Sequence, residues 1–149
     1  MRAAIAEATA AAKSSAVPSV VDVPVGAVVL DAPGTIIARA GNRREADSDP
    51  TAHAEILAIR QAAGALGSRR LDGCTLVVTL EPCTMCAGAV LAARPARLVY
   101  GASDPKAGAV GSVWDVIRDR RVSPAIEVIS GVLAAECAGL LGDFFGQRR

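Results

Sequence analysis

The sequence is short of several residue types, and each shortage excludes a class of protein. Its 149 residues include one histidine and four cysteines, and only 3% are aromatic. Four cysteines are too few for the disulfide-dense scaffolds of small secreted domains, so we expect a reducing compartment. Sixteen Lys and Arg against fifteen Asp and Glu leave a formal charge of +1. This balance argues against a protein that binds nucleic acid through bulk positive charge.

Long uncharged apolar runs are also absent. The mean hydropathy is +0.37, yet no stretch reaches the roughly 18 apolar residues that a membrane-spanning helix requires. The Ala-rich residues 1–12 resemble a signal peptide, but Glu7, Thr9 and Lys13 interrupt the apolar run. We therefore interpret this segment as an amphipathic helix and predict a cytoplasmic protein that makes no contact with a membrane.

The residues that the sequence does contain predict one compact α/β domain. Hydrophobic residues make up 52% of the chain, which predicts a single domain over residues 1–149 with a substantial core. The expected strands are residues 23–30, 35–40, 75–80, 97–100 and 126–129. The expected helices are residues 3–13, 83–93, 112–118 and 133–145. A further helix is expected to have Asp49 as its N-cap and Pro50 as its first residue, and to end near residues 64–67. This order predicts a three-layer α-β-α sandwich with a mixed five-stranded sheet.

The most specific local pattern is the Cys-x-x-Cys pair of Cys83 and Cys86. Two thiolates at this spacing in the first turn of a helix can reach one metal ion. A redox pair or two buried thiols would give the same spacing. A structural zinc site usually needs four protein ligands, and the sequence contains no second Cys pair or His pair. Cys74 and Cys137 are isolated and are expected to be small core residues.

The single histidine, His53, is the candidate third ligand. It lies thirty residues before Cys83, and both segments are expected to start helices after loops at one edge of the sheet. A helix N-terminus carries roughly half a positive charge, which favours thiolates and hydroxide. Three N and S ligands leave the fourth zinc position for water, whose pKa falls from 15.7 to about 7 when it is bound. We therefore expect Zn²⁺ in a hydrolytic site.

Glu55 is the candidate proton carrier. It follows His53 by two residues, about 200° around an ideal helix, so the two side chains do not share a face. This difficulty disappears if the pocket lies over the end of the helix, with Glu55 beside the bound water. The alternative is a carboxylate that only stabilises a helix N-terminus, by some tenths of a kcal/mol.

The His-x-Glu pair and the Pro-Cys-x-x-Cys run resemble the signature of the zinc-dependent cytidine deaminase-like superfamily. Within it, residues 23–28, 49–56, 79–89 and 143–145 resemble the bacterial tRNA adenosine-34 deaminases. The resemblance covers nearly the whole chain from Val23 onward.

This resemblance implies the deaminase fold, a homodimer, one Zn²⁺ per subunit, and conversion of the wobble adenosine of an arginine tRNA anticodon stem-loop to inosine. It implies that His53, Cys83 and Cys86 bind zinc. Glu55 would donate and accept protons while a zinc-activated water attacks C6 of adenine and ammonia leaves. The same match implies contacts to the substrate at Asn42, Ala54, Asp104, Lys106, Phe144, Phe145, Arg148 and Arg149, among which the Ala54 N–H lies near the active-site water.

The residues leave alternatives open. Either Phe144 or Phe145 can be a core residue instead of a base-stacking one. A free-base or nucleoside deaminase that acts on guanine or cytosine would use the same zinc and Glu55, without exposed aromatic and arginine residues beyond the pocket. A non-enzymatic, zinc-stabilised RNA-binding module would have no need of Glu55.

Overall fold

The computed structural model describes residues 1–13, 21–122 and 125–146. The elements in chain order are α1 (Arg2–Ala11), β1 (Gly26–Leu30), β2 (Ile36–Gly41), α2 (Ala54–Leu66), β3 (Thr75–Leu80), α3 (Thr84–Ala93), β4 (Arg97–Ala102), β5 (Glu127–Ile129) and α4 (Ala134–Gly146). Within these ranges, no helix has both the length and the apolar composition needed to span a bilayer.

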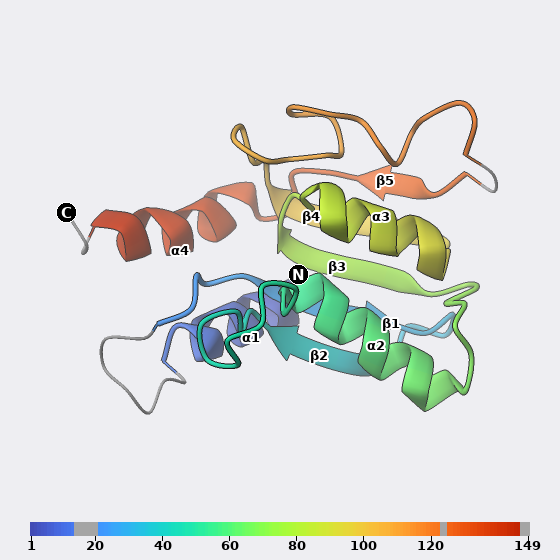
Figure 1. Cartoon of the computed structure of the whole chain (residues 1–149), viewed down its shortest axis with the longest axis horizontal. Coiled ribbons are helices and arrows are strands. Elements are labelled where there is room, and N and C mark those ends of the chain that lie inside the picture. The colour runs from blue at the N-terminus through green and yellow to red at the C-terminus, as the bar shows by residue number, and fades with distance from the viewer. Residues whose placement is uncertain (14–20, 123–124, 147–149) are drawn as a thin grey trace.

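The five strands form one mixed sheet in the order β2-β1-β3-β4-β5 (Figure 1). β1 runs antiparallel to both of its neighbours, with Ala27 opposite Ala40 in β2 and Val78 in β3. β3, β4 and β5 run parallel to one another, with Val77 of β3 opposite Val99 of β4. The β1–β2 hairpin is antiparallel, whereas β3 connects to β4 through α3 and β4 connects to β5 through a long segment, because parallel neighbours need a long crossover.

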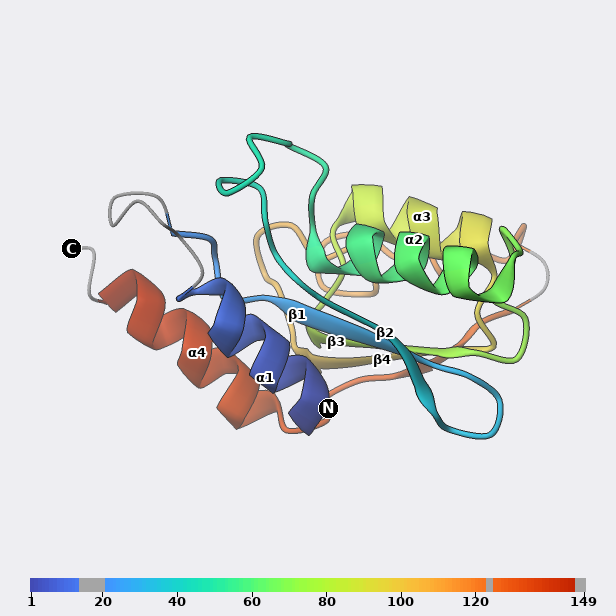
Figure 2. The same cartoon turned by 90° about the horizontal axis from the view of Figure 1, so that it is seen from below.

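Helices cover both faces of the sheet (Figure 2). α1 and α4 pack on one face, and α2 and α3 pack on the other. The strands between them are apolar on both sides, and Val29, Leu76 and Leu98 in the three central strands are fully buried. The predicted three-layer α-β-α sandwich is therefore confirmed.

Small residues bring α1 very close to the sheet. Ala8 is fully buried in the face of α1 that contacts β1 and β2. A Cβ placed on Gly41 would lie 2.8 Å from the Glu7 carbonyl oxygen and 2.8 Å from the Ala11 Cβ. Gly26 has still less room against the backbone of α1. Glycine at these two strand positions is therefore a requirement of the close approach between helix and sheet.

The second predicted helix starts later than the sequence indicates. α2 begins at Ala54 with His53 as its N-cap, so the prediction of Asp49 as the cap and Pro50 as the first helical residue is wrong. Asp49 Oδ1 instead accepts hydrogen bonds from the backbone N–H and the hydroxyl of Thr51, both at 2.7 Å. This local turn satisfies the Asp49 side chain, which then does not cap the helix.

The predicted helix over residues 112–118 is also wrong, because turns occupy this segment. The N–H groups of Val110 and Ser112 donate to Glu81 Oε1 at 2.9 and 3.0 Å, and the Arg118 guanidinium donates to the Val110 carbonyl at 2.8 Å. Within the segment, the N–H of Val116 donates to the Ala109 carbonyl at 3.0 Å and the N–H of Arg118 donates to Asp115 Oδ1 at 3.2 Å, so neither makes the bond to the carbonyl four residues earlier that a helix requires. The other elements begin and end within three residues of their predicted bounds.

Candidate metal centre

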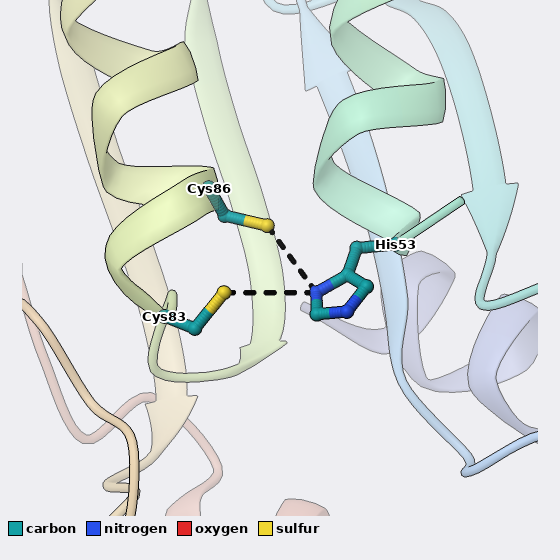
Figure 3. A group of neighbouring side chains, drawn as sticks. All are labelled: His53, Cys83 and Cys86. Atoms are coloured by element: carbon teal, nitrogen blue, oxygen red, sulfur yellow. Dashed lines mark hydrogen bonds between the residues drawn. The ribbon is translucent and has the colours of Figure 1, made fainter. Parts of the chain in front are cut away.

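Two helices present their N-terminal residues to each other (Figure 3). His53 is the N-cap of α2 and Cys83 is the N-cap of α3. Their backbones are extended, with φ −70° and ψ 149° at His53 and φ −72° and ψ 175° at Cys83. The His53 side chain does not cap its own helix, and the Cys83 sulfur pairs with the two other members of the cluster, Cys86 and His53. Both are therefore available to bind a ligand between the helix ends.

The donor set fits a zinc ion. His53 Nδ1 lies 3.7 Å from Cys83 Sγ and 3.4 Å from Cys86 Sγ. Tetrahedral zinc, with Zn–S near 2.3 Å and Zn–N near 2.0–2.1 Å, would place N and S ligand atoms about 3.6 Å apart. All three ligand atoms lie within 4.8 Å of one another, and the described residues contain no other such cluster of three or more His, Cys, Asp or Glu. The three predicted ligands are thus brought together.

The cluster favours a negative charge on sulfur. A hydrogen bond from the Cys86 thiol is the main cause that lowers the pKa of Cys83, to about 3. The same hydrogen bond, together with burial, raises the pKa of Cys86. The hydrogen bond with Cys83 also raises the pKa of His53. A thiolate and an imidazole side by side are suitable ligands for a divalent metal ion. When the ion binds, it displaces the protons that remain on these ligands.

Glu55 lies in the first turn of α2 and is only 4% exposed. Burial is the largest cause that raises its pKa, opposed by a hydrogen bond from its own backbone N–H and by the nearby His53. Because His53 is an extended N-cap residue, the 200° separation of an ideal helix does not apply. Glu55 is not one of the clustered ligands, yet it lines the same pocket as His53. A carboxyl group that retains its proton more readily suits general acid–base work.

The metal centre opens into a small pocket of about 160 Å³. Val25 and Leu80 form part of its apolar wall, and Asn42, Ala54 and Asp104 are also in its lining. Pockets that enclose drug-sized ligands measure roughly 300–1,000 Å³. This pocket therefore suits a single nucleobase better than a whole nucleotide.

Asn42 is buried at the pocket wall, where only 6% of it is exposed. Its backbone N–H donates to the Val25 carbonyl at 2.8 Å, and its Nδ2 donates to the Val23 carbonyl at 3.3 Å. Its Oδ1 has no hydrogen-bond partner among the described residues. A buried acceptor without a partner is unfavourable for folding, so it marks a candidate contact for a ligand.

Other predicted contact residues lie away from this pocket. Lys106 is exposed in the loop after β4 and is not part of the pocket lining. Phe144 and Phe145 lie in α4, on the sheet face opposite α2 and α3 (Figure 2), with their rings edge-to-face at 5.2 Å. Arg148 and Arg149 lie outside the residues that the structure describes.

Among the titratable residues of the pocket that sequence reasoning missed is a second glutamate, Glu81. It follows β3 directly, lines the pocket and is only 2% exposed. Burial raises its pKa, but hydrogen bonds from Ser112, Asp104 and Val110 together outweigh that effect and leave the pKa below its ordinary value. The available signal was a glutamate at the end of an apolar strand, immediately before the Pro-Cys pair.

A larger hollow of about 380 Å³ lies between α1 and α4. Thr9, Leu140 and Phe144 contribute to its lining, and no histidine, cysteine or glutamate from the described part of the chain does. Chemical character, rather than size, therefore places the candidate site at the ends of α2 and α3.

Comparisons with known proteins identify the family of the chain. Residues 1–102 match the profile of the cytidine and deoxycytidylate deaminase zinc-binding region. A tRNA-specific adenosine deaminase of Bacillus subtilis is 50% identical over 128 residues, which cover 86% of this chain and 79% of that protein. These similarities confirm the resemblance that the sequence motifs indicate.

Solved structures show the same fold. A structure from studies of A-to-I editing by tRNA:A34 deaminases at the wobble position of transfer RNA has a TM-score of 0.86 and 47% identity, and the match covers 95% of this chain and 97% of that one. A guanine deaminase from Nitrosomonas europaea has a TM-score of 0.77 and 28% identity over 96% of this chain and 81% of that one. The deaminase-like fold class is thus confirmed.

Proposed function

The chain belongs to the cytidine and deoxycytidylate deaminase zinc-binding family, and from that premise we propose that it deaminates adenosine 34, the wobble base of a tRNA anticodon loop. One water is consumed, inosine forms and ammonia is released. The observation that carries the proposal is that His53, Cys83 and Glu55 line one pocket of about 160 Å³. Cys86 is buried beside them in the same metal-binding cluster. The tRNA-specific relative at 50% identity supports the choice of adenosine in tRNA as the substrate.

The chain's own residues divide the chemistry between binding and proton transfer. His53, Cys83 and Cys86 would hold one Zn²⁺ per chain. When bound, zinc lowers the pKa of water and so supplies the nucleophile. Glu55 would take a proton from that water and deliver it to N1 of adenine. It would then take the proton of the new C6 hydroxyl and deliver it to the amino group, so that the C6–N bond breaks, ammonia leaves and the C6 carbonyl of inosine forms.

Asn42, Ala54 and Asp104 would hold the base within the pocket. The unpartnered Oδ1 of Asn42 is an acceptor for a hydroxyl or amino group of the nucleoside. The N–H of Ala54 lies in the first turn of α2, where backbone N–H groups lack intrahelical acceptors, so it can donate to the water or to the substrate. A base that enters so small a pocket must first leave its stack.

Contacts with the rest of the RNA belong to the same proposal. The resemblance assigns these contacts to Lys106, Phe144, Phe145, Arg148 and Arg149, and Phe145 is 54% exposed, as a stacking residue would be. Because α4 lies on the opposite face of the sheet from α2 and α3, the RNA would have to extend beyond the pocket to reach it. A homodimer, an arginine tRNA and a cytoplasmic location complete the proposal.

A guanine deaminase is the alternative that a specific observation favours. The Nitrosomonas europaea guanine deaminase shares the fold at a TM-score of 0.77, and a free base would also fit the pocket. Its lower identity, 28% against 47% for the tRNA:A34 deaminase structure, makes it the weaker candidate. An RNA-binding module without activity would not explain why a carboxyl group is buried beside the metal ligands, because such burial is unfavourable.

A side-by-side assay of the zinc-loaded protein separates these functions. The substrates are an arginine tRNA anticodon stem-loop, free adenosine, guanine and cytosine, and ammonia release is measured for each. We expect the stem-loop to be the preferred substrate by kcat/KM. A preference for guanine or cytosine would reject the tRNA assignment while leaving a zinc deaminase.

We predict that Glu55→Gln removes activity but not zinc. The amide cannot exchange the proton, so inosine formation should fall by about 10²-fold to 10⁴-fold, the usual contribution of general acid–base catalysis. Zinc content and thermal unfolding should remain those of the native protein. Glu127→Gln, in the exposed β5, provides the matched control and should retain full activity. Substantial turnover by Glu55→Gln would contradict the assigned role.

A further inference from the structure

Glu81 is a buried carboxylate with an unusually complete set of donors from one loop. Its Oε1 accepts from the N–H groups of Val110 and Ser112 at 2.9 and 3.0 Å. Its Oε2 accepts from the N–H of Asp104 at 3.0 Å and from the Ser112 hydroxyl. All four bonds therefore lead from the end of β3 to the segment of residues 104–112, here called the pocket loop.

The pocket loop also lies against the turn that carries the metal ligands. The N–H of Ala109 donates to the Pro82 carbonyl at 2.8 Å, and Gly108 forms an isolated antiparallel bridge with Cys83. Two residues of this loop, Asp104 and Ala107, line the pocket beside Glu55. Glu81 thus connects one wall of the pocket to the segment that carries Cys83.

The fit between the loop and the carboxylate leaves no room for a side chain at Gly108. A Cβ at this position would lie 2.5 Å from Glu81 Cδ, 2.6 Å from Glu81 Oε2 and 2.6 Å from the Asp104 carbonyl oxygen. Real Cβ atoms essentially never approach so closely, so adding one would force the loop or the carboxylate to move. This packing is independent of the hydrogen bonds and points to the same close association.

We propose that Glu81 is a positioning residue whose carboxylate holds the pocket loop in the place where Asp104 and Ala107 can contact the substrate. This proposal rests on the proposed deaminase function, because it assigns the substrate-binding wall of that site. Glu81 donates no proton in it and binds no metal. His53, Cys83, Cys86 and Glu55 are held by α2 and α3, so loss of the loop's position should weaken substrate binding more than the chemical step.

Glu81→Gln is the sharpest substitution because it preserves size and removes one acceptor. The amide oxygen can keep the two bonds from Val110 and Ser112 N–H, but the NH₂ group would face the N–H of Asp104, and two donors cannot pair. The Asp104 N–H then has no acceptor, and the loop should detach at the end that lines the pocket. Hydrogen bonds to charged groups are strong enough for such a loss to change an equilibrium by about tenfold or more.

Two readouts report on the loop. The first is KM and kcat for the anticodon stem-loop, where we expect Glu81→Gln to raise KM about tenfold and to leave kcat within about threefold. The second does not depend on activity. The chain has two lysines, Lys13 and Lys106, so a lysine-specific protease reports cleavage at Lys106 within the loop, with Lys13 as an internal reference. Cleavage at Lys106 should accelerate about tenfold with zinc content unchanged.

Matched variants separate positioning from general loosening. Thr79→Val removes a buried acceptor of the same strand, the hydroxyl that receives the Gly26 N–H at 3.1 Å, without touching the loop. It should leave KM and cleavage at Lys106 as in the native protein. Gly108→Ala keeps the carboxylate but displaces the loop, and should reproduce the rise in KM, even if Glu81→Gln fails to fold.

Three results would contradict the positioning role of Glu81. A native KM in folded Glu81→Gln, or an equal rise of KM in Thr79→Val, would overturn the positioning role. A native rate of cleavage at Lys106 in both Glu81→Gln and Gly108→Ala would overturn it as well. If the native protein does not deaminate the stem-loop, the proposed function fails, whereas the protease experiment still decides whether Glu81 holds the loop.

Discussion

At the scale of single residues, Asn42 shows a conflict between stability and binding. Its Oδ1 is buried without a partner among the described residues, while its Nδ2 makes one bond of 3.3 Å to the Val23 carbonyl. An unmet acceptor opposes folding by about as much as an ordinary hydrogen bond supports it. Asn42 should therefore contribute little to the stability of the protein.

We predict that Asn42→Ala changes the free energy of unfolding by less than about 1 kcal/mol while KM for the stem-loop rises at least about tenfold. Urea denaturation and steady-state kinetics measure the two effects. Asp22→Ala is the control, since the buried Asp22 carboxylate accepts from the N–H groups of Glu45 and Ala46 at 2.9 and 3.1 Å. It should destabilise the protein by more. A large loss of stability in Asn42→Ala with unchanged KM would contradict this assignment.

The identity of a residue predicts a metal ligand better than it predicts a residue that holds a loop in place. His53, Cys83 and Cys86 could be found from the sequence because few side chains bind zinc, and the chain has one histidine and one Cys-x-x-Cys pair. Glu81 was harder to find, since three of its four donors are backbone N–H groups of residues 104 to 112, and backbone groups carry no sequence signature. Whether a glutamate is solvated or buried depends on a loop path that local pattern does not determine.

At the scale of elements, the same limit explains the two errors of helix prediction. Asp49 suits an N-cap, but its oxygen pairs with Thr51 and the helix starts at Ala54. Residues 112–118 have a suitable pattern, but Asp115 Oδ1 accepts at 3.2 Å from the N–H of Arg118, which a helix would pair with the Trp114 carbonyl. In both cases a specific side-chain acceptor competes with helix formation. Strands with apolar residues on both sides, such as β3, are predicted well because burial repeats along the whole element.

The contact between α1 and the sheet gives a prediction at this scale. Gly41→Ala should lower the free energy of unfolding by about 1–3 kcal/mol, because the added Cβ would overlap the Glu7 carbonyl oxygen and Ala11. Gly64→Ala in α2 is the matched control. Nothing lies within 4 Å of a Cβ there, so it should stabilise the protein by about 0.5–1 kcal/mol. Equal effects of the two substitutions in urea denaturation would contradict the packing argument.

At the scale of the whole molecule, the four cysteines separate into two environments. Cys74 and Cys137 are 2% and 1% exposed, and burial raises the pKa of each thiol. They confirm the expectation of small core residues. Cys83 and Cys86 lie together at the metal centre, where zinc would occupy both sulfur atoms.

We predict three stages of alkylation by a thiol reagent at neutral pH. The zinc-loaded protein should react slowly at every cysteine, the chelated protein at Cys83, whose pKa is lowered, and the protein in denaturant at all four, because Cys86 is as buried as Cys74 and Cys137. Mass spectrometry of the labelled peptides identifies each stage. Labelling of Cys74 or Cys137 by chelation alone would show that the metal supports the core as well as the site.

The positions of the three ligands along the chain have a further consequence. His53 and Cys83 are thirty residues apart, and α2, β3 and the loop that joins them lie between the two. An ion that binds both residues would close this segment into a loop. It would reduce the conformational entropy of the unfolded chain, as a disulfide does. A disulfide across a loop of that length contributes about 3–4 kcal/mol. In a chain whose cysteines form no disulfides, the metal would thus be a removable cross-link as well as a reagent.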